Sequence, residues 1–226
     1  MKLRKVTPAG FPGRFLGIVP GLVLGLLLGG CAGSYRVVQV PEHAADLYPL
    51  SQTRAGITIA VDEIRNAARA QRHFGANLIK EGILPVNVVL SNYGKQRVVV
   101  KPSDVLLYRG KEIIDPLPYE IVAANAKRQH RFLQQQTEEE IDKFFSHSMF
   151  KETVLGPNET YRGVVFYAVS APSGRTGFFS MLNGFSEGGP TLRVGLTDVD
   201  NGQRLLFGPF SVSTRDVPAR FSYGSY

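Results

Sequence analysis

The sequence predicts a mainly β protein, an antiparallel sandwich with one helical insertion, preceded by an N-terminal segment of different character. Short apolar or alternating stretches recur between turn signals, which is typical of antiparallel β domains. Residues 118–150 change to helical spacing. The 24 glycines and 14 prolines supply frequent chain breaks, and a hydrophobic fraction of 43% suffices for one packed core.

The N-terminal segment, residues 1–30, has the pattern of a cleaved signal peptide. Basic residues without any acidic one precede an apolar run over 15–28. This run is short for a membrane span and ends at small residues. We expect the segment to direct export and to be removed.

The single cysteine follows directly, in the run Leu28-Gly29-Gly30-Cys31. This run resembles the lipobox of bacterial lipoproteins, in which cleavage occurs before the cysteine. By this resemblance Cys31 is the lipidation site, with diacylglycerol on its sulfur and a palmitate-type acyl group on its amine. Two or three such chains, at about 0.8 kcal/mol for each buried CH₂, would hold the protein on a membrane. The alternative is an ordinary transmembrane anchor with an incidental thiol.

The residue after the cysteine bears on location. In the lipoproteins whose lipobox this run resembles, an aspartate directly after the cysteine favours inner-membrane retention. This chain has Ala32 at that position. We therefore expect the outer membrane, with the folded part in the periplasm or at the surface. The formal net charge of +7 includes four positive residues of the signal segment, so the mature chain carries +3. This small excess argues against a nucleic-acid partner.

The mature chain is expected to begin with a lipidated tether over 31–55. Prolines interrupt this stretch and no hydrophobic period is sustained. A coil of about 24 residues spans roughly 25–30 Å, which would lift a domain clear of the headgroups. The β domain is predicted over 56–213, followed by a tail over 214–226.

In the first half of the domain, a strand is followed by a short helix over Glu63–Phe74 that ends at Gly75. Pro85 is expected at the first position of the next strand, where proline is tolerated. The expected strands are 57–61, 86–91, 98–100, 105–108 and 112–114.

The insertion over 118–150 is predicted to form two helices. The first is Tyr119–Ala126, and the second follows a capping box that begins at Thr137. Strands resume at 163–169, 192–196 and 205–212, the last two joined by a hairpin turn at Asp200-Asn201-Gly202. Eight or nine short strands favour a sandwich of immunoglobulin-like type.

A family resemblance covers roughly residues 56–213. It is carried by Phe-Gly-Ala-Asn-Leu at 74–78, Gly-Ile-Leu-Pro-Val at 82–86, and Gly-Val-Val-Phe at 163–166 after a Gly-Pro-Asn-Glu turn. The chain is similar in these motifs to uncharacterised bacterial envelope lipoproteins with an immunoglobulin-like domain. The resemblance implies the fold and an envelope setting, and it implies no catalytic residue.

No motif of the sequence predicts a metal, a cofactor or a catalytic group. The four histidines lie in four separate segments without metal-ligand spacing, and one cysteine excludes a Cys-based zinc site. A serine-nucleophile elbow, a P-loop and a dinucleotide fingerprint are absent. Asp198–Gly202 has a faint likeness to a calcium loop, but its register fails, and a hairpin turn explains it better.

Two apolar groups are candidates for an interaction surface. The glycine-rich segment Gly177–Pro190 either folds over a sheet or meets a partner or lipid. The helix after Thr137 is either core, or a surface for a partner groove or a membrane, because its aromatics exceed what one narrow stripe needs. The residues concerned are Phe178, Phe179, Met181, Leu182 and Phe185 in the first group, and Phe144 and Phe145 in the second.

These observations favour a non-catalytic binding or assembly module that is held on the membrane by a lipid and meets another envelope protein. One alternative is a surface lipoprotein that supports the envelope structurally. The competing class is an enzyme whose site assembles from distant carboxylates such as Asp104, Glu120 and Asp198.

Overall fold

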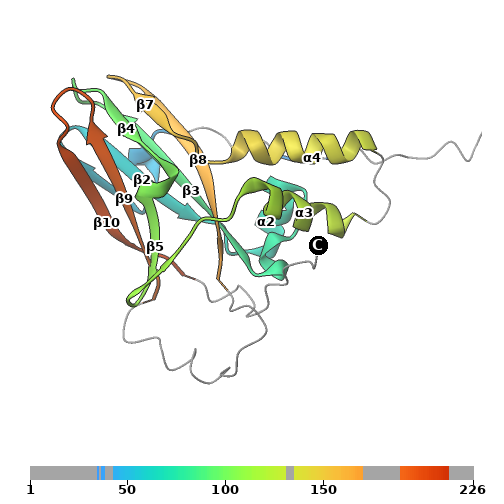
Figure 1. Cartoon of the computed structure of the whole chain (residues 1–226). Coiled ribbons are helices and arrows are strands. Elements are labelled where there is room, and N and C mark those ends of the chain that lie inside the picture. The colour runs from blue at the N-terminus through green and yellow to red at the C-terminus, as the bar shows by residue number, and fades with distance from the viewer. Residues whose placement is uncertain (1–34, 36, 39–42, 131–134, 170–188, 214–226) are drawn as a thin grey trace, which may run out of the picture. The chain divides into compact units, whose positions relative to one another are not determined.

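A computed structural model of the chain places two antiparallel sheets face to face across a shared core (Figure 1). The structure describes residues 35, 37–38, 43–130, 135–169 and 189–213. All of these belong to one unit, Ser34–Tyr226.

The four-stranded sheet has the order β1-β2-β3-β8. The longest pairing joins β3 and β8, from Ile83 opposite Ala168 to Ser91 opposite Thr160. Its strands are β1 (Ser51–Arg54), β2 (Ile57–Glu63), β3 (Ile83–Asn92) and β8 (Thr160–Ala168).

The six-stranded sheet is organised around β9, which pairs with β10, β4 and β5. The 3-10 turn η3 (Pro102–Asp104) separates β4 from β5, and both strands are antiparallel to β9. The strands are β4 (Val98–Val100), β5 (Val105–Arg109), β6 (Glu112–Ile114), β7 (Thr153–Leu155), β9 (Thr191–Asp198) and β10 (Arg204–Ser211).

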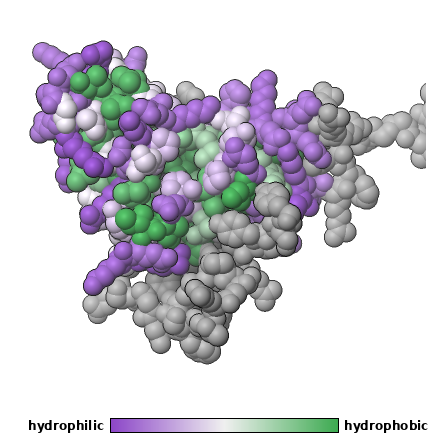
Figure 2. Space-filling view, viewed as in Figure 1, coloured by the Kyte–Doolittle hydropathy of each residue, from purple (hydrophilic) through white to green (hydrophobic). Residues whose placement is uncertain are grey.

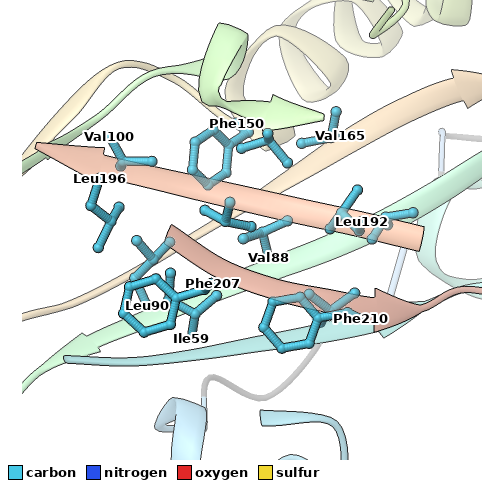
Figure 3. Packing of buried hydrophobic residues seen from close by; sticks show 14 of the residues in the cluster. Ile59, Val88, Leu90, Val100, Phe150, Val165, Leu192, Leu196, Phe207 and Phe210 are labelled. Atoms are coloured by element: carbon cyan, nitrogen blue, oxygen red, sulfur yellow. The ribbon is translucent and has the colours of Figure 1, made fainter. Parts of the chain in front are cut away.

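The core between the sheets is built from alternate residues of their strands. Successive side chains of a strand point to opposite faces, so every second residue enters this core. Figure 3 shows Val88 and Leu90 of β3 facing Leu192 of β9 and the rings of Phe207 and Phe210 of β10. Leu192, Val194 and Leu196 of β9 are all buried in this core, which confirms the alternation expected for 192–196.

Three helices form a second core against the other face of the four-stranded sheet (Figure 1). They are α2 (Ala67–Phe74), α3 (Tyr119–Gln129) and α4 (Gln135–Ser148). In β8, Val165 belongs to the core between the sheets, whereas Val164 and Phe166 belong to the helical core. The continuous apolar run predicted over 163–169 is therefore buried on both faces, as expected.

A short segment before the first strand covers the rest of that face. The 3-10 turn η1 (Ala45–Leu47) packs Ala45 against Ala60 of β2 and Val89 of β3. The Ala45 amide donates to the Ser91 hydroxyl oxygen at 3.0 Å. Both this turn and β1 lie within residues 31–55, where a free tether was expected, so the fold begins earlier than the sequence pattern indicates.

The predicted helices are present with shifted starts. The first begins at Ala67 rather than Glu63, because β2 extends to Glu63 and the Asn66 side chain caps the helix by accepting from the Arg69 amide at 3.1 Å. It ends at Gly75 with a φ of 60°, as predicted. Helix α4 begins at Gln135, so Thr137 lies in its first turn rather than at its cap.

Pro85 lies inside β3, opposite Phe166, rather than at the first position of the strand. Its carbonyl accepts from the Ile64 amide at 2.9 Å, just beyond Glu63, the last residue of β2. The nitrogen and carbonyl of one strand residue point to the same side, so the proline nitrogen faces the place where pairing with β2 has ended. A proline is tolerated there because the N–H that it lacks would belong to the terminal pair, beyond the last residue of β2.

Candidate functional site

The chain just after the predicted lipidation site is attached to the helices through Tyr35. Its ring makes edge contacts with His130 and Phe144, at centroid distances of 5.9 and 5.8 Å. Its hydroxyl donates a hydrogen bond to the Phe74 carbonyl at the end of α2. Burial of the side chain raises the pKa of Tyr35 above its usual value. We call this arrangement the Tyr35 contact.

Gly75 makes room for the tyrosine ring. A Cβ on this residue would lie 2.5 Å from a ring carbon of Tyr35, and its φ of 60° already favours glycine. The same glycine ends α2 and offers its carbonyl to the His130 ring at 3.0 Å. One residue thus terminates a helix, admits Tyr35 and joins α2 to the end of α3.

A second attachment follows three residues later. The Val38 amide donates to the Arg72 carbonyl of α2 at 2.9 Å. The chain therefore meets the last turn of α2 at both Tyr35 and Val38, before it reaches η1. Only three residues separate Cys31 from Tyr35.

A polar network joins α2 to the four-stranded sheet. The Arg69 guanidinium of α2 pairs with both carboxylate oxygens of Asp62 in β2. The fully buried Asn87 of β3 donates to the same carboxylate at 3.2 Å and accepts from Arg162 of β8 at 3.2 Å. The carboxylate is thus held between a cation and an amide, and the network fixes the helix on the sheet.

His73 lies beside this network with one ring nitrogen facing Arg69. The Arg69 Nε–H donates to His73 Nε2 at 3.4 Å, while His73 Nδ1 is buried without a hydrogen-bond partner. Burial lowers the pKa of His73, and the nearby Arg69 charge lowers it further. These surroundings therefore favour the neutral imidazole.

Exposed apolar residues lie on the six-stranded sheet and its turns, where Figure 2 shows hydrophobic groups separated by hydrophilic residues. Charges interrupt this surface, because Arg193 lies over the Tyr108 ring at 5.1 Å and Arg204 pairs with Asp104 at 2.9 Å. The surface therefore offers several small contacts rather than one apolar patch. The residues concerned are Ile113 of β6, Val154 of β7, Val199 of the turn and Leu206 of β10.

The interaction residues predicted from sequence have different outcomes. Phe145 is fully buried, stacked on Phe74 and in edge contact with Phe166, so it belongs to the helical core and not to a surface. Phe144 is half-buried and packs against Tyr35. The other five predicted interaction residues lie outside the described residues, and so does Cys31. These five are Phe178, Phe179, Met181, Leu182 and Phe185.

The three candidate carboxylates have separate settings. Asp104 pairs with Arg204. Asp198 accepts from the amides of Asp200 and Asn201 at 2.8 and 3.2 Å, which shapes the predicted hairpin turn. Glu120 is exposed in the first turn of α3. The structure gives each carboxylate a local structural contact or a solvated position.

The histidines have separate contacts as well. His43 packs against Tyr48, and His147 lies 2.6 Å from the Lys143 carbonyl. Over the described residues, no group of three metal-binding side chains comes together. Within the same residues, the helices are all too short or too polar to cross a membrane.

Sequence reasoning missed the Tyr35 contact and the Asp62–Arg69 pair. Tyr35 and Phe74 are 39 residues apart, and no local pattern indicates such a contact. Asp62 and Arg69 are seven residues apart, but one lies in a strand and the other in a helix, so no single hydrophobic period indicates their pairing. One signal was available, because Tyr35 is an aromatic residue in a stretch that otherwise looks like a linker. The sequence predicts Gly75 only as the end of the helix. Its second role, making room for the Tyr35 ring, is visible only in three dimensions.

Comparison with known proteins gives distant structural similarity. No protein-family model matches the chain, and no curated protein matches it. The ycdA protein of Bacillus subtilis, described as a candidate lipoprotein, aligns over 74% of this chain with a TM-score of 0.35 and 12% identity. This chain spans 38% of that protein. The yjhA protein of Bacillus subtilis aligns over 73% of this chain and 97% of its own length, with a TM-score of 0.37 and 11% identity.

Proposed function

We propose that the chain is a lipid-anchored lipoprotein of the cell envelope, whose folded unit is a non-catalytic binding or assembly module. The observation that carries the proposal is the run Leu28–Cys31 at the end of a basic and then apolar segment, with the sole cysteine at the position of attachment. Ala32 after the cysteine favours the outer membrane. The folded unit would lie in the periplasm or at the cell surface.

The two-sheet unit is proposed to be of immunoglobulin-like type. Its sheets are antiparallel and pack their inner faces on each other, which is the arrangement of such sandwiches. Sandwiches of this type present loops at their ends and are common scaffolds for recognition. The helical layer is an addition that covers the outer face of one sheet.

A binding role agrees with the settings of the carboxylates, three of which form ion pairs within the fold. The carboxylates of Asp62, Asp104 and Asp142 each pair with a cation from another element, which stabilises the fold. Exposed apolar residues such as Val154 and Leu206 remain available on the six-stranded sheet. The partner we propose is another protein of the envelope, contacted by this surface and by the apolar segment Gly177–Pro190.

Lipidation is tested by growing cells with a tagged fatty acid. The unaltered chain should incorporate the label and run as the shorter, processed form. Cys31→Ser should abolish the label and leave the precursor uncleaved, while Gln39→Ser, a matched change later in the mature chain, should do neither. Unchanged labelling of Cys31→Ser would refute the lipoprotein assignment.

Partner binding is tested by placing a photo-crosslinking residue at position 181 or at position 201 of the full chain. A defined adduct from position 181, absent from the exposed turn position 201, is expected. The Phe178→Ala/Phe179→Ala variant should lose the adduct, since anchoring aromatics often carry about 2 kcal/mol or more of binding free energy. Recovery of only the monomer from position 181 would contradict this role for the segment.

A further inference from the structure

We infer that the Tyr35 contact holds the lipidated protein with helix α2 against the membrane, so that the exposed Arg65 and Arg72, at the two ends of α2, meet anionic lipid headgroups. This inference rests on the proposed lipidation of Cys31. It goes further by giving the folded unit a fixed orientation and a lipid-binding surface.

The short chain between Cys31 and Tyr35 limits how far the folded unit can lie from the lipid. Residues 32–34 are all that separate Cys31 from Tyr35. An extended chain advances by about 3.3–3.6 Å per residue, so the two Cα atoms lie within about 14 Å of each other. A free tether of about 24 residues would span roughly twice that distance on average. The attached face therefore stays close to the headgroups.

The attachment selects which face is presented. Tyr35 contacts Phe74 and Val38 contacts Arg72, both in the last turn of α2. The chain that carries the lipid thus joins the folded unit at the C-terminal end of this helix. Rotation of the unit is limited because Tyr35 is also packed against α3 and α4, through His130 and Phe144.

The charge of this face suits anionic lipid. The segment 64–80 contains four cationic residues and no Asp or Glu, and Arg69 among them is paired with Asp62. Arg65 and Arg72 are both exposed. Arg72 lies in the last turn of α2, whereas Arg65 lies just before the helix, next to its cap residue Asn66. A basic residue near an anionic membrane surface strengthens binding about five-fold.

The other side of the Tyr35 contact has the opposite charge. Glu138, Glu139 and Glu140 are exposed on α4 within two turns of Phe144. Anionic headgroups repel these carboxylates and attract Arg65 and Arg72, which tilts the unit toward α2. The exposed Ala67 and Ala68 add no large apolar group, so the contact is peripheral rather than inserted.

This orientation has a consequence for partner binding. The helices and the six-stranded sheet lie on opposite faces of the four-stranded sheet. With α2 on the lipid, the six-stranded sheet faces away from the membrane, with Val154 and Leu206 exposed to a partner.

The test uses the full, lipidated chain in vesicles of phosphatidylglycerol and phosphatidylethanolamine that carry a quencher on the headgroups. Cys31 is the only cysteine, so one introduced cysteine takes a fluorescent label uniquely once Cys31 is lipidated. Ala68→Cys places the label on α2, and Asn201→Cys places it in the turn between β9 and β10. We expect strong quenching at position 68 and little at position 201.

Two further variants test whether the Tyr35 contact and the two arginines cause this difference in quenching. Tyr35→Ala should reduce the difference in quenching between the two positions, because the tether then extends to the remaining attachment at Val38. Arg65→Gln/Arg72→Gln should weaken the quenching at position 68 in anionic vesicles and leave it unchanged in phosphatidylcholine vesicles. These arginines are exposed, so their replacement should leave the fold intact.

Equal quenching at positions 68 and 201 in the otherwise unaltered lipidated chain would overturn the inference. So would a difference that is undiminished in Tyr35→Ala. Incorporation of the tagged fatty acid is measured on the same samples. Its absence would refute the lipoprotein assignment, whereas lipidated protein without a preferred orientation would refute the orientation alone.

Discussion

Gly163 of β8 lies so close to Phe150 that a Cβ on the glycine would be 2.5 Å from the Phe150 Cα. The closeness follows from the end of α4, where Met149 bridges Val164 and the Phe150 amide donates to the Val164 carbonyl at 2.9 Å. The chain leaving the helical layer thus runs directly along the edge of the four-stranded sheet. Only a glycine allows this approach.

Gly163→Ala should therefore destabilise the protein. The added methyl group meets backbone rather than a flexible side chain, so β8 or residue 150 must shift, at a cost of about 1–3 kcal/mol. Urea unfolding measures the loss. Gly189→Ala is the matched control, because its nearest neighbour would be the Val212 carbonyl oxygen at 3.5 Å. Equal midpoints for the two variants would contradict this account.

Phe145→Ala should cost about 3–5 kcal/mol of unfolding free energy, since it removes a fully buried ring from the helical core. Glu138→Ala on the exposed side of the same helix should change it by no more than about 0.5 kcal/mol. Thermal or urea unfolding decides between core and surface roles. A Phe145→Ala variant as stable as Glu138→Ala would restore the surface interpretation.

His73 should make stability depend on pH. Burial and then the Arg69 charge lower its pKa in the folded state below the ordinary 6.5, so on acidification the unfolded chain binds this proton first. The contribution of His73 to the free energy of unfolding is therefore complete above pH 6.5, and it decreases as the pH drops below this value. Unfolding in urea at about pH 7.5 and about pH 5.5 measures the change.

His73→Gln removes the titrating group and should flatten the part of the pH dependence that lies just below 6.5. His147→Gln is the control, because His147 is exposed and its hydrogen-bond contacts among the described residues are with the Lys143 carbonyl and the neighbouring Ser146. An identical pH dependence in the His73→Gln variant and the unaltered chain would show that this histidine does not contribute.

Most strands of the fold could be predicted from the sequence because their signals are local, but β1 and the three-residue β7 were not predicted. The run 163–169 has apolar residues at nearly every position, which indicated burial on both faces, and Val164 and Val165 indeed enter different cores. Strand β1 gave no such signal. Its sequence is Ser-Gln-Thr-Arg with half-buried and exposed side chains at a sheet edge, so its pairing with β2 is visible only in three dimensions.

The helical core explains why the surface prediction failed at Phe145. A helix that contacts one neighbour needs one narrow apolar stripe, and the aromatics of α4 exceed this. In the structure α4 contacts α2, β8 and Tyr35 through different rings, so Phe144 and Phe145 are both used. Tyr35 and Phe74 are 39 residues apart, which is why the sequence pattern could not reveal the contact.

Asn92 is the residue whose hydrogen bonds tie the turn regions of the two sheets together. It is fully buried at the end of β3, and its amide nitrogen lies 2.8 Å from the Gln96 carbonyl, 3.0 Å from that of Gly156 and 3.3 Å from that of Leu155. Its side-chain oxygen accepts from the Gly94 amide at 2.9 Å. Both a donor and an acceptor are therefore needed at this position.

Asn92→Asp should be strongly destabilising although it is nearly isosteric. A carboxylate cannot donate to the three carbonyls, and a buried group left without its hydrogen bond costs about 1–3 kcal/mol, more when it is charged. Asn201→Asp is the matched control, because that side chain is exposed and accepts from the Gln203 amide at 2.7 Å, which a carboxylate also does. Urea unfolding should show a much lower midpoint for Asn92→Asp alone. Because protonation of the new carboxyl restores one donor, part of the lost stability should return on acidification, and equal midpoints for the two variants at neutral pH would refute the assigned role of Asn92.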